Sequence, residues 1–560
     1  MPQARRKVPF SGKAKKQQLQ AKKQNKTLLL SNPSSVPSND TYNDQINAYM
    51  AVNYQPTKSR GRSDGNRYAL KFYRESNEEL KMKKEEAFKS LNPVSEKEME
   101  IDPTDYFPKD ISFPQRPPWD FNMTAAALDA QEQKYFREYI QTLQNSPHWK
   151  DMSYFELNLE TWRQLWRVLE MCDILLLIVD VRYAGMMFPP SLYEYIVNDQ
   201  KKNMILVLNK IDLVPASVVA GWKDFLTDKY PGLRVVYFTS CPGYNLAGGS
   251  SDKGGLQVRR RKGRQRMCAE GATKILEACK DIVRNEVDLS AWEKKIKEET
   301  NVEFEDDETE VGETIYEKVD TTYYTHEKYK NGVLTIGCVG QPNVGKSSLM
   351  NAIMGKKVVS VSRTPGHTKH FQTICLTTGV RLCDCPGLVF PSKVPRSIQI
   401  LMGSYPIAQL REPYTAIRYL AERLDLPRLL RIEHPENDDT WSPRDICDGW
   451  AKKRGYLTAK AARLDTYRAA NSILRMALDG SLCLWLRPPK FTEKREKYEE
   501  CQEIKYIKWV QALTNENVAD TPSDSGTEVS SPNDDSQESD DDSDEQTEIA
   551  NKFAALAGDD

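Results

Sequence analysis

The chain has 560 residues and a formal net charge of −1, a length that leaves room for about two to four domains with cores of their own. Its eleven cysteines are scattered without C-x-x-C pairs, which excludes a zinc-finger or disulfide scaffold and indicates a reducing compartment. No apolar run approaches the ~20 residues of a membrane-spanning helix, and the basic start has no apolar stretch after it, which argues against a secretory signal.

Charge is segregated along the chain. The first 26 residues carry nine Lys or Arg and no acid, whereas Val518–Glu548 carries twelve Asp or Glu and no base. Blocks of like charge resist collapse and act as solvated interaction tails. We therefore expect residues 1–60 to form a disordered basic arm. Residues 491–560 are expected to form a charged helix, Lys490–Val510, followed by a disordered acidic tail.

Residues 61–157 mix helical stretches with Pro-rich connectors, and Glu78–Lys89 and Ala125–Leu143 are the predicted helices. The predicted helix Glu160–Met171 follows, with Trp162 and Trp166 on one face. Apolar residues share that face at spacings of three and four, which favours core packing for the tryptophans over base stacking.

Residues 158–395 are predicted to form an α/β domain. Short, unbroken apolar runs are separated there by helix-length segments, a pattern typical of a mostly parallel sheet with helices on both faces. The predicted strands are Ile174–Val179, Met204–Leu208, Val235–Phe238, Val333–Val339, Thr373–Leu376 and Val380–Leu382.

A charged insertion, residues 242–330, interrupts this domain and is long for a connection within one fold. It holds a basic cluster, Arg259–Arg266, a predicted helix, Thr273–Val287, and an acidic run, Glu303–Glu310. No order is predicted for either charged run. After Pro391 the pattern turns helical, and residues 396–490 are predicted to form a helical C-terminal domain.

The segment Gly340–Ser347 reads G-Q-P-N-V-G-K-S and follows a predicted strand. It fits G-x-x-x-x-G-K-[ST], a loop whose glycines let backbone N–H groups converge on phosphates. Lys346 would reach the β- and γ-phosphates, and the Ser347 hydroxyl would bind Mg²⁺. The candidate nucleotide-binding residues of this loop are Gln341, Pro342, Asn343, Val344, Gly345, Lys346, Ser347 and Ser348.

A second motif, Asp384-Cys385-Pro386-Gly387, follows another predicted strand and fits D-x-x-G. The Asp384 carboxylate is expected to hold Mg²⁺ through a water, and the Gly387 N–H is expected to sense the γ-phosphate. Thr368 lies between the two motifs and is expected to supply a second hydroxyl to Mg²⁺. Lys346, Thr368 and Gly387 form the predicted catalytic set.

Asn209-Lys210-Ile-Asp212 closes a predicted buried strand, where a base-reading N-K-x-D motif belongs. A carboxylate accepts hydrogen bonds from guanine N1–H and the 2-amino group, whereas adenine offers neither donor, so Asp212 selects GTP. After the next strand, Ser240 and Cys241 are expected to place backbone N–H groups near the base oxygen.

The order of these motifs is rotated, because N-K-x-D lies upstream of the phosphate loop and ordinary GTPases carry it downstream. In such a permuted domain the usual ends of the G domain are joined, and its new C-terminal end lies elsewhere. Here that end falls just after Gly387, in the segment that moves on hydrolysis. That segment runs directly into the helices after Pro391. We expect loss of the γ-phosphate to move these helices.

The order N-K-x-D, G-x-P-N-V-G-K-S, D-x-P-G resembles the circularly permuted GTPases that serve ribosome assembly. Within that family, Trp162–Val168, Ile178–Arg182, Phe188–Tyr195 and Pro9–Lys16 are similar to the guanine nucleotide-binding protein-like 1 group. The resemblance covers most of residues 110–490 and the basic start. A related large-subunit GTPase of cytoplasmic pre-ribosomes is also similar, through the G domain and the Arg454–Thr458 region.

The resemblance implies a permuted P-loop G domain and slow GTP hydrolysis to GDP, since Leu388 stands where many GTPases carry a water-orienting Gln. It also implies that the phosphate-loop Asn, here Asn343, holds a K⁺ ion. That ion would take the place of an arginine finger in hydrolysis. Two positions depart from the family pattern. Cys241 stands where Ala is frequent, and Asp180-Val-Arg182 matches D-A-R only loosely.

Several features have plainer interpretations beside the functional ones. Cys383 and Cys385 are interpreted as small buried side chains rather than a metal or redox pair. His367 and His370 are assigned to shape or solvent exposure rather than catalysis. The basic arm is equally compatible with a localisation signal and with RNA contact. The acidic tail, with Ser536, Ser539 and Ser543, is either a solubilising tail or a phosphorylated or masking segment. These three serines predict a phosphoprotein.

We therefore predict a slow, Mg²⁺-dependent GTPase that acts as a nucleotide switch in large-subunit ribosome biogenesis, with GTP and GDP as ligands and K⁺ as a possible stimulator. Its expected partner is ribosomal RNA or a pre-ribosomal particle, bound through the basic arm, in the nucleus or nucleolus with shuttling to the cytoplasm. No membrane partner is expected. The alternative is a regulatory GTP-binding protein with protein partners and no direct ribosomal role.

Overall fold

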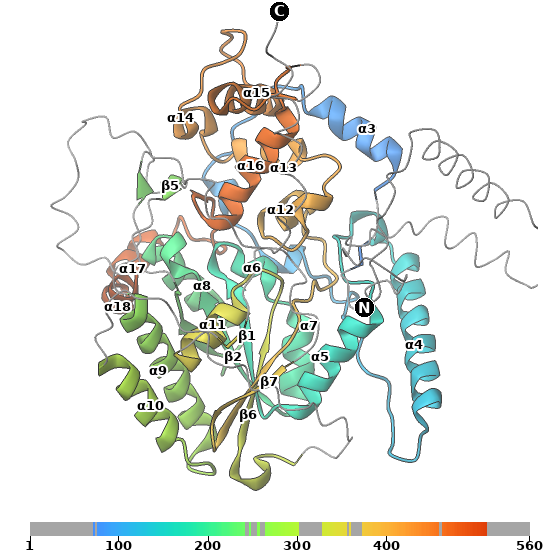
Figure 1. The fold of residues 1–560 in the computed structure, drawn as a ribbon, viewed down its shortest axis with the longest axis vertical. Helices are drawn as coiled ribbons and strands as arrows, with labels where there is room; N and C mark the ends of the chain where they lie inside the picture. The colour runs from blue at the N-terminus through green and yellow to red at the C-terminus, as the bar shows by residue number, and fades with distance from the viewer. Residues whose placement is uncertain are drawn as a thin grey trace, which may run out of the picture.

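The computed structural model describes residues 71–72, 75–240, 246–247, 255–257, 264–301, 327–355, 358–359, 372–458 and 462–511 (Figure 1). The basic arm, the acidic tail, the acidic run of the insertion and the start of its basic cluster lie outside these residues. No helix among the described residues combines the length and apolar character needed to cross a bilayer.

A six-stranded sheet forms the centre of the molecule, in the order β3-β2-β1-β6-β8-β7. Five strands are parallel, and β7 pairs antiparallel with β8 at one edge. The strands are β1 Ile174–Asp180, β2 Asn203–Asn209, β3 Arg234–Tyr237, β6 Leu334–Val339, β7 Gln372–Thr377 and β8 Val380–Asp384. The prediction of a mostly parallel sheet is confirmed, and the six predicted strands are all present.

The chain order within the sheet places the sites of interest together. The chain builds β1, β2 and β3 outward in one direction and then returns to place β6 on the other side of β1. It next forms β7 at the far edge, and β8 fills the position between β6 and β7. The order therefore reverses between β1 and β6, and ligands of open α/β sheets bind at the carboxyl ends of strands at such a point.

Helices cover both faces of the sheet, and Figure 1 shows α9 and α10 on one side and α5 and α7 on the other. All seven residues of β1 are buried, as expected of a strand covered on both faces. Trp162 and Trp166 of α5 are buried too, so their predicted role in core packing is confirmed. The helices of this part are α3 Asn77–Glu86, α4 Ala125–Asn145, α5 Leu159–Met171, α6 Ala184–Met187, α7 Pro190–Glu194, α8 Ala216–Lys229, α9 Arg264–Val283, α10 Ser290–Asn301 and α11 Lys346–Met354.

A helical region lies above the carboxyl ends of the strands (Figure 1). It comprises α12 Arg396–Leu401, α13 Tyr414–Ala421, α14 Leu426–Leu430, α15 Pro443–Arg454 and α16 Thr466–Asp479. Its buried apolar side chains join those of the sheet in one continuous cluster. A small second sheet, β4-β5-β9, pairs Leu246–Ala247, Gly255–Gln257 and Leu482–Cys483. We call residues 396–486 the helical region below.

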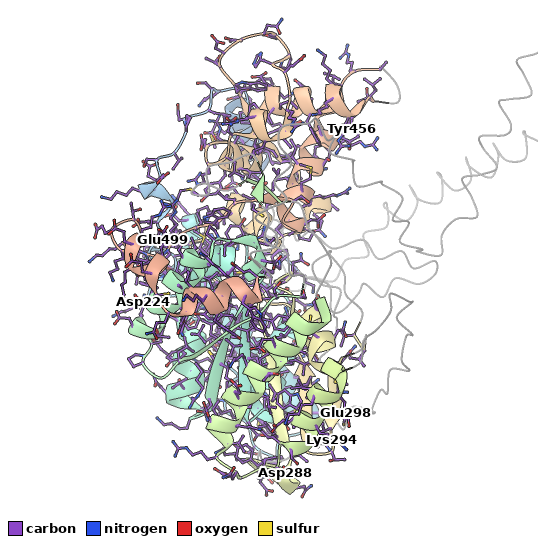
Figure 2. All side chains as sticks on the ribbon, turned by 90° about the vertical axis from the view of Figure 1, so that its left-hand side faces the viewer. Asp224, Asp288, Lys294, Glu298, Tyr456 and Glu499 are labelled. Atoms are coloured by element: carbon purple, nitrogen blue, oxygen red, sulfur yellow. The ribbon has the colours of Figure 1, made fainter. Side chains whose placement is uncertain are left out.

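Two predicted helices differ from the structure. The single helix predicted over Lys490–Val510 is wrong: the chain forms α17 Arg495–Glu500 and α18 Glu503–Val510, separated at Cys501, whose backbone is extended. The break lets both helices pack on α8. Figure 2 shows Glu499 of α17 and Asp224 of α8 on the same flank. There Lys497 Nζ lies 3.0 Å from Asp224 Oδ2 and the Tyr498 hydroxyl lies 3.1 Å from it.

The second difference concerns the insertion. The helix predicted over Thr273–Val287 begins earlier, at Arg264, and ends at Val283. The last residues of the basic cluster are therefore helical, contrary to expectation. The second half of the helix buries an apolar face, because Ile275, Cys279 and Val283 are buried at helical spacing.

Candidate nucleotide-binding site

The phosphate loop lies between β6 and α11, at the carboxyl edge of the sheet. Gly345 caps α11 with φ of 98°, a left-handed conformation that favours glycine. A Cβ at this position would lie 2.4 Å from Asn209 Nδ2, so the close approach of the two motifs also requires glycine. Lys346 is buried, and its Nζ donates to the carbonyls of Gly340 at 3.0 Å and Gln341 at 2.7 Å. Ser347 and Ser348 follow in the first turn of the helix.

The D-x-x-G motif lies directly beside this loop, because β8 pairs with β6 and places Asp384 opposite Cys338. The Leu388 N–H donates to Gly340 O at 3.2 Å. A Cβ on Gly387 would lie 2.8 Å from Pro342 Cα, so only glycine allows this approach. Cys385 and Pro386 are buried in the same segment. Cys383 is buried as well, which agrees with the packing role expected for the two cysteines.

Asp384 has the environment of a cation ligand. It is fully buried, its Oδ2 lies 3.5 Å from Ser347 Oγ, and its Oδ1 has no hydrogen-bond partner among the described residues. Burial raises the pKa of this carboxyl to about 6, although the Lys346 charge opposes the shift. Oxygen donors of this kind suit Mg²⁺, and a buried carboxylate oxygen without a partner fits a site completed by a metal or its water.

The base-reading motif reaches the phosphate loop through direct hydrogen bonds. Asn209 Nδ2 donates to Val344 O at 2.6 Å, and Lys210 Nζ donates to Asn343 O at 2.7 Å. The Thr239 hydroxyl donates to Asp212 Oδ1 at 2.6 Å and thereby orients the carboxylate. Ser240 follows Thr239 at the carboxyl end of β3. Segments more than 130 residues apart therefore form one site.

Two predicted site residues, Thr368 and Cys241, lie outside the described residues, as do His367 and His370. All the others lie at the carboxyl edge of the sheet. The structure therefore brings the phosphate loop, the D-x-x-G segment and the base-reading motif together at one edge of the sheet.

Sequence reasoning missed the contacts from the helical region. Asn343 Nδ2 donates to Gly403 O at 2.9 Å, and the Ser404 hydroxyl donates to Gln341 Oε1 at 2.7 Å. A Gly-Ser pair after α12 carries no motif, so nothing in the sequence marked it. Sequence reasoning also left Asp180 and Arg182 without a role, although two charged residues at the end of an apolar strand were a usable signal.

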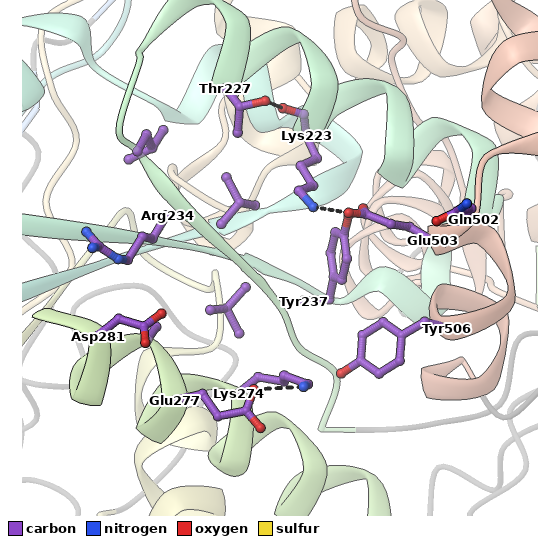
Figure 3. A pocket seen from close by; sticks show the side chains of 14 residues that line it. Lys223, Thr227, Arg234, Tyr237, Lys274, Glu277, Asp281, Gln502, Glu503 and Tyr506 are labelled. Carbon is purple, nitrogen blue, oxygen red and sulfur yellow. Dashed lines mark hydrogen bonds and ion pairs between the residues drawn. The ribbon is translucent and has the colours of Figure 1, made fainter.

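A cavity of about 560 Å³ lies apart from this site, against the edge strand β3 (Figure 3). Lys223, Lys274 and Glu503 are among its lining residues, from α8, α9 and α18. The Tyr237 hydroxyl donates to Glu503 Oε2 at 2.7 Å, and Lys223 pairs with the same carboxylate. None of the nucleotide motifs contributes to it.

Comparison with known proteins agrees with the arrangement of the site. Residues 335–419 match the family described as "50S ribosome-binding GTPase". The chain is 44% identical over 531 residues to "Guanine nucleotide-binding protein-like 1" of Mus musculus, covering 88% of this chain and 87% of the relative. It is equally 44% identical over 530 residues to the protein of that name from Homo sapiens, with the same coverage. "Large subunit GTPase 1" of Schizosaccharomyces pombe is 32% identical over 399 residues, 68% of this chain and 58% of the relative.

Identity at this level over most of both chains, together with the permuted motif order and the assembled site, settles the family and the basic activity, which is GTP hydrolysis. The chain belongs to the guanine nucleotide-binding protein-like 1 family of circularly permuted GTPases.

Proposed function

We propose that this chain is a slow, Mg²⁺-dependent GTPase that acts as a nucleotide switch in the biogenesis of the large ribosomal subunit. The observation that carries the proposal is the pair of contacts from Asn209 and Lys210 to the phosphate loop. These contacts join the guanine-reading motif directly to the phosphate-binding loop, which is what a site for one guanine nucleotide requires.

Each side chain of the site has a role in this proposal. Lys346 exchanges its bonds to the loop carbonyls for bonds to the β- and γ-phosphates. Ser347, Asp384 and Thr368 would hold Mg²⁺, which supplies charge neutralisation at the phosphates when bound. The Gly387 N–H senses the γ-phosphate. Asp212 accepts from guanine N1–H and the 2-amino group, and the backbone N–H groups of Ser240 and Cys241 would donate to the base oxygen.

Slow hydrolysis follows from the residue after D-x-x-G. Leu388 is buried with an exposed fraction of 0%, and a leucine offers no group that orients the attacking water. Asn343 is the proposed ligand for a stimulating K⁺. Because its amide nitrogen donates to Gly403, the amide oxygen is the atom that K⁺ would use. A rate that stays unchanged when Na⁺ replaces K⁺ would remove this part of the proposal.

The switch segment is proposed to act on the helical region. After Leu388, the Val389 carbonyl accepts from Glu156 N at 3.1 Å and the Ser392 carbonyl accepts from Ser153 N at 2.9 Å. Only a few residues then separate this anchored segment from α12. Movement of Gly387 on loss of the γ-phosphate would therefore pull directly on the helices. Identical hydrogen exchange across Ser392–Leu486 with GTP analogue and with GDP would contradict this coupling.

The proposed partner is ribosomal RNA or a pre-ribosomal particle, bound through the basic residues 1–26, in the nucleus or nucleolus with shuttling to the cytoplasm. The names of the relatives and of the matching family support the ribosomal context. The alternative remains a regulatory GTP-binding protein with protein partners. Phosphorylation of Ser536, Ser539 and Ser543 in the acidic tail is part of the same proposal.

Co-sedimentation with purified ribosomal subunits, with GTP analogue against GDP, tests the ribosomal role. We expect nucleotide-dependent binding to the large subunit that weakens steeply with salt and is lost on removal of residues 1–26. Binding that is insensitive to salt and to this deletion would favour the alternative with protein partners.

A further inference from the structure

The charged pair at the end of β1 is among the most deeply buried in the molecule. Asp180 and Arg182 both have an exposed fraction of 0%. Arg182 Nε donates to Asp180 Oδ1 at 3.0 Å and Nη2 donates to Oδ2 at 2.8 Å, a two-point contact. The Arg182 backbone N–H donates to Oδ1 as well, at 3.1 Å. Val181 between them is buried as well. The departure from D-A-R therefore lies at the middle position, and both charged residues of the motif are present.

The pair also contacts the guanine-reading motif. The strand register sets Asp180 of β1 opposite Asn209 of β2, and Lys210 follows directly. Asp180 Oδ2 lies 2.9 Å from Lys210 Nζ, which also donates to Asn343 O. The lysine ammonium is therefore held on one side by a carboxylate and on the other by the phosphate loop. Lys210 itself has a left-handed backbone, with φ of 61°, so its side chain departs from the strand at this fixed point.

The same arginine extends to the helical region. Its remaining nitrogen, Nη1, donates to Ala477 O at 2.8 Å, in the last turn of α16. A cation at a helix C-terminus is favourable because the last carbonyls carry partial negative charge. The Arg182 carbonyl accepts from Leu486 N at 2.9 Å, so the segment that follows α16 is held at the same residue. A planar guanidinium can bridge a carboxylate and a carbonyl at once, whereas an ammonium cannot reproduce this fork.

Because the pair is buried, its charges must be balanced by the groups that it contacts. Burial alone would raise the pKa of Asp180, but the charges of Arg182 and Lys210 lower it well below its usual range. Asp180 therefore stays ionised and keeps both cations neutralised. Loss of the helical contact would leave the arginine one bond short and free to reorient, which would change how Asp180 holds the lysine.

We infer that Asp180 and Arg182 are positioning residues that set Lys210 for guanine binding only when α16 of the helical region is docked at the end of β1. The inference rests on the proposed nucleotide site and adds a second connection to the helical region, on the side of the base rather than of the γ-phosphate. Guanine affinity and the docking of α16 are then linked, so that each stabilises the other.

A double-mutant cycle on the full-length protein tests this link, with fluorescent GDP as the probe. Arg182→Lys keeps the charge and loses the bridge, and we expect it to weaken GDP binding by about tenfold, within the range of coupling between sites. In a Lys210→Ala background the same change should cost less than about twofold, because the residue through which it acts is gone. Arg163→Lys, in a buried ion-pair group between α4 and α5, is the matched control and should leave GDP affinity unchanged.

The outcomes separate the inference from the function on which it rests. A parent protein that binds no GDP contradicts the proposed function. A parent that binds GDP, with equal losses from Arg182→Lys in both backgrounds, overturns the inference. Should Arg182→Lys fail to fold, hydrogen exchange of α16 answers the same question in Lys210→Ala, whose side chain is partly exposed. We expect saturating GDP to protect residues 474–486 in the parent and to protect them less in Lys210→Ala. Equal protection would overturn the inference.

Discussion

The sheet and the helical region contribute to the nucleotide site in different ways. The sheet supplies charged and polar side chains from compact motifs, among them Asp212, Lys346 and Asp384. The helical region supplies two backbone carbonyls, of Gly403 and Ala477, and the hydroxyl of Ser404. The sheet side thus supplies the side chains proposed to contact nucleotide and Mg²⁺. The helical region supplies contacts that hold the loops bearing those side chains. Side chains that must contact a ligand form a recognisable sequence motif, whereas contacts made by backbone carbonyls can come from any residue type.

The largest effect should come from the sheet side. Lys346→Ala removes a buried cation that the phosphates need, and loss of such a contact costs roughly 2–5 kcal/mol. We expect affinity for GTP to fall by at least about 30-fold in a titration with fluorescent GTP. Lys274→Ala, in the cavity of Figure 3, is the control and should bind as the parent does. Retained binding by Lys346→Ala would remove the phosphate-loop assignment.

Asp212→Asn should change the choice of base. The amide presents a donor toward guanine N1–H and suits the C2 carbonyl of xanthine instead. Loss of hydrogen bonds to a charged acceptor, about 1.5–3 kcal/mol, predicts a fall in GTP affinity of about 10- to 150-fold and a gain for xanthosine triphosphate. Competition titrations with the two nucleotides measure it, with the exposed Asp281→Asn as control. An Asp212→Asn variant that binds GTP as tightly as the parent would refute the assignment.

Glu156 contacts the switch segment that leads to the helical region, and its titration should affect stability. It is fully buried, accepts from the backbone N–H groups of Lys71 and Asn158, and donates its own N–H to Val389 of the switch segment. Burial raises its pKa to about 8, despite these hydrogen bonds.

The unfolded chain releases the Glu156 proton near the ordinary value of 4.5 and the folded chain holds it to about 8. The folded state therefore binds more protons in this interval, and the free energy of unfolding falls as the pH rises through it. Relative to Glu156→Gln, we expect the parent to lose roughly 3–4 kcal/mol between pH 5 and 8 in urea denaturation. A difference that is constant with pH would show that Glu156 does not titrate in this range.

The smallest effect should come from the helical side. Ser404→Ala removes one hydrogen bond to Gln341 and should lower the free energy of unfolding by about 1 kcal/mol. It should also raise hydrogen exchange in the phosphate loop, which a purely local role in the helical region would leave unchanged. Thr142→Ala, at the exposed surface of α4, is the control. Unchanged loop exchange in Ser404→Ala would mean that this contact does not brace the loop.

Much of the fold could be predicted because its signals are local. Apolar runs such as Ile174–Val179 predict buried strands, and the predicted strands lie within one or two residues of the observed ones. The break at Cys501 could not be predicted, because it depends on packing against α8, which is far away in sequence. The early start of α9 could not be predicted either, because the basic cluster Arg259–Arg266 has no apolar residues at helical spacing.

The candidate site divides in the same way. Its motif residues could be named from the sequence because phosphate and guanine demand particular side chains at fixed spacing. The partners of Asn343 and Gln341 could not, since a glycine carbonyl and a serine hydroxyl occur throughout any chain. Asp180 and Arg182 stand between these cases: their charges at the end of an apolar strand were visible, but their partners Lys210 and Ala477 were not.

The most direct test is an equilibrium titration of the purified chain with fluorescent GTP at millimolar magnesium. Convergence of Asn209, Lys346 and Asp384 predicts saturable uptake of one nucleotide per chain, displaced by unlabelled GDP and not by ADP. No saturable uptake, or equal displacement by ADP, would contradict the account.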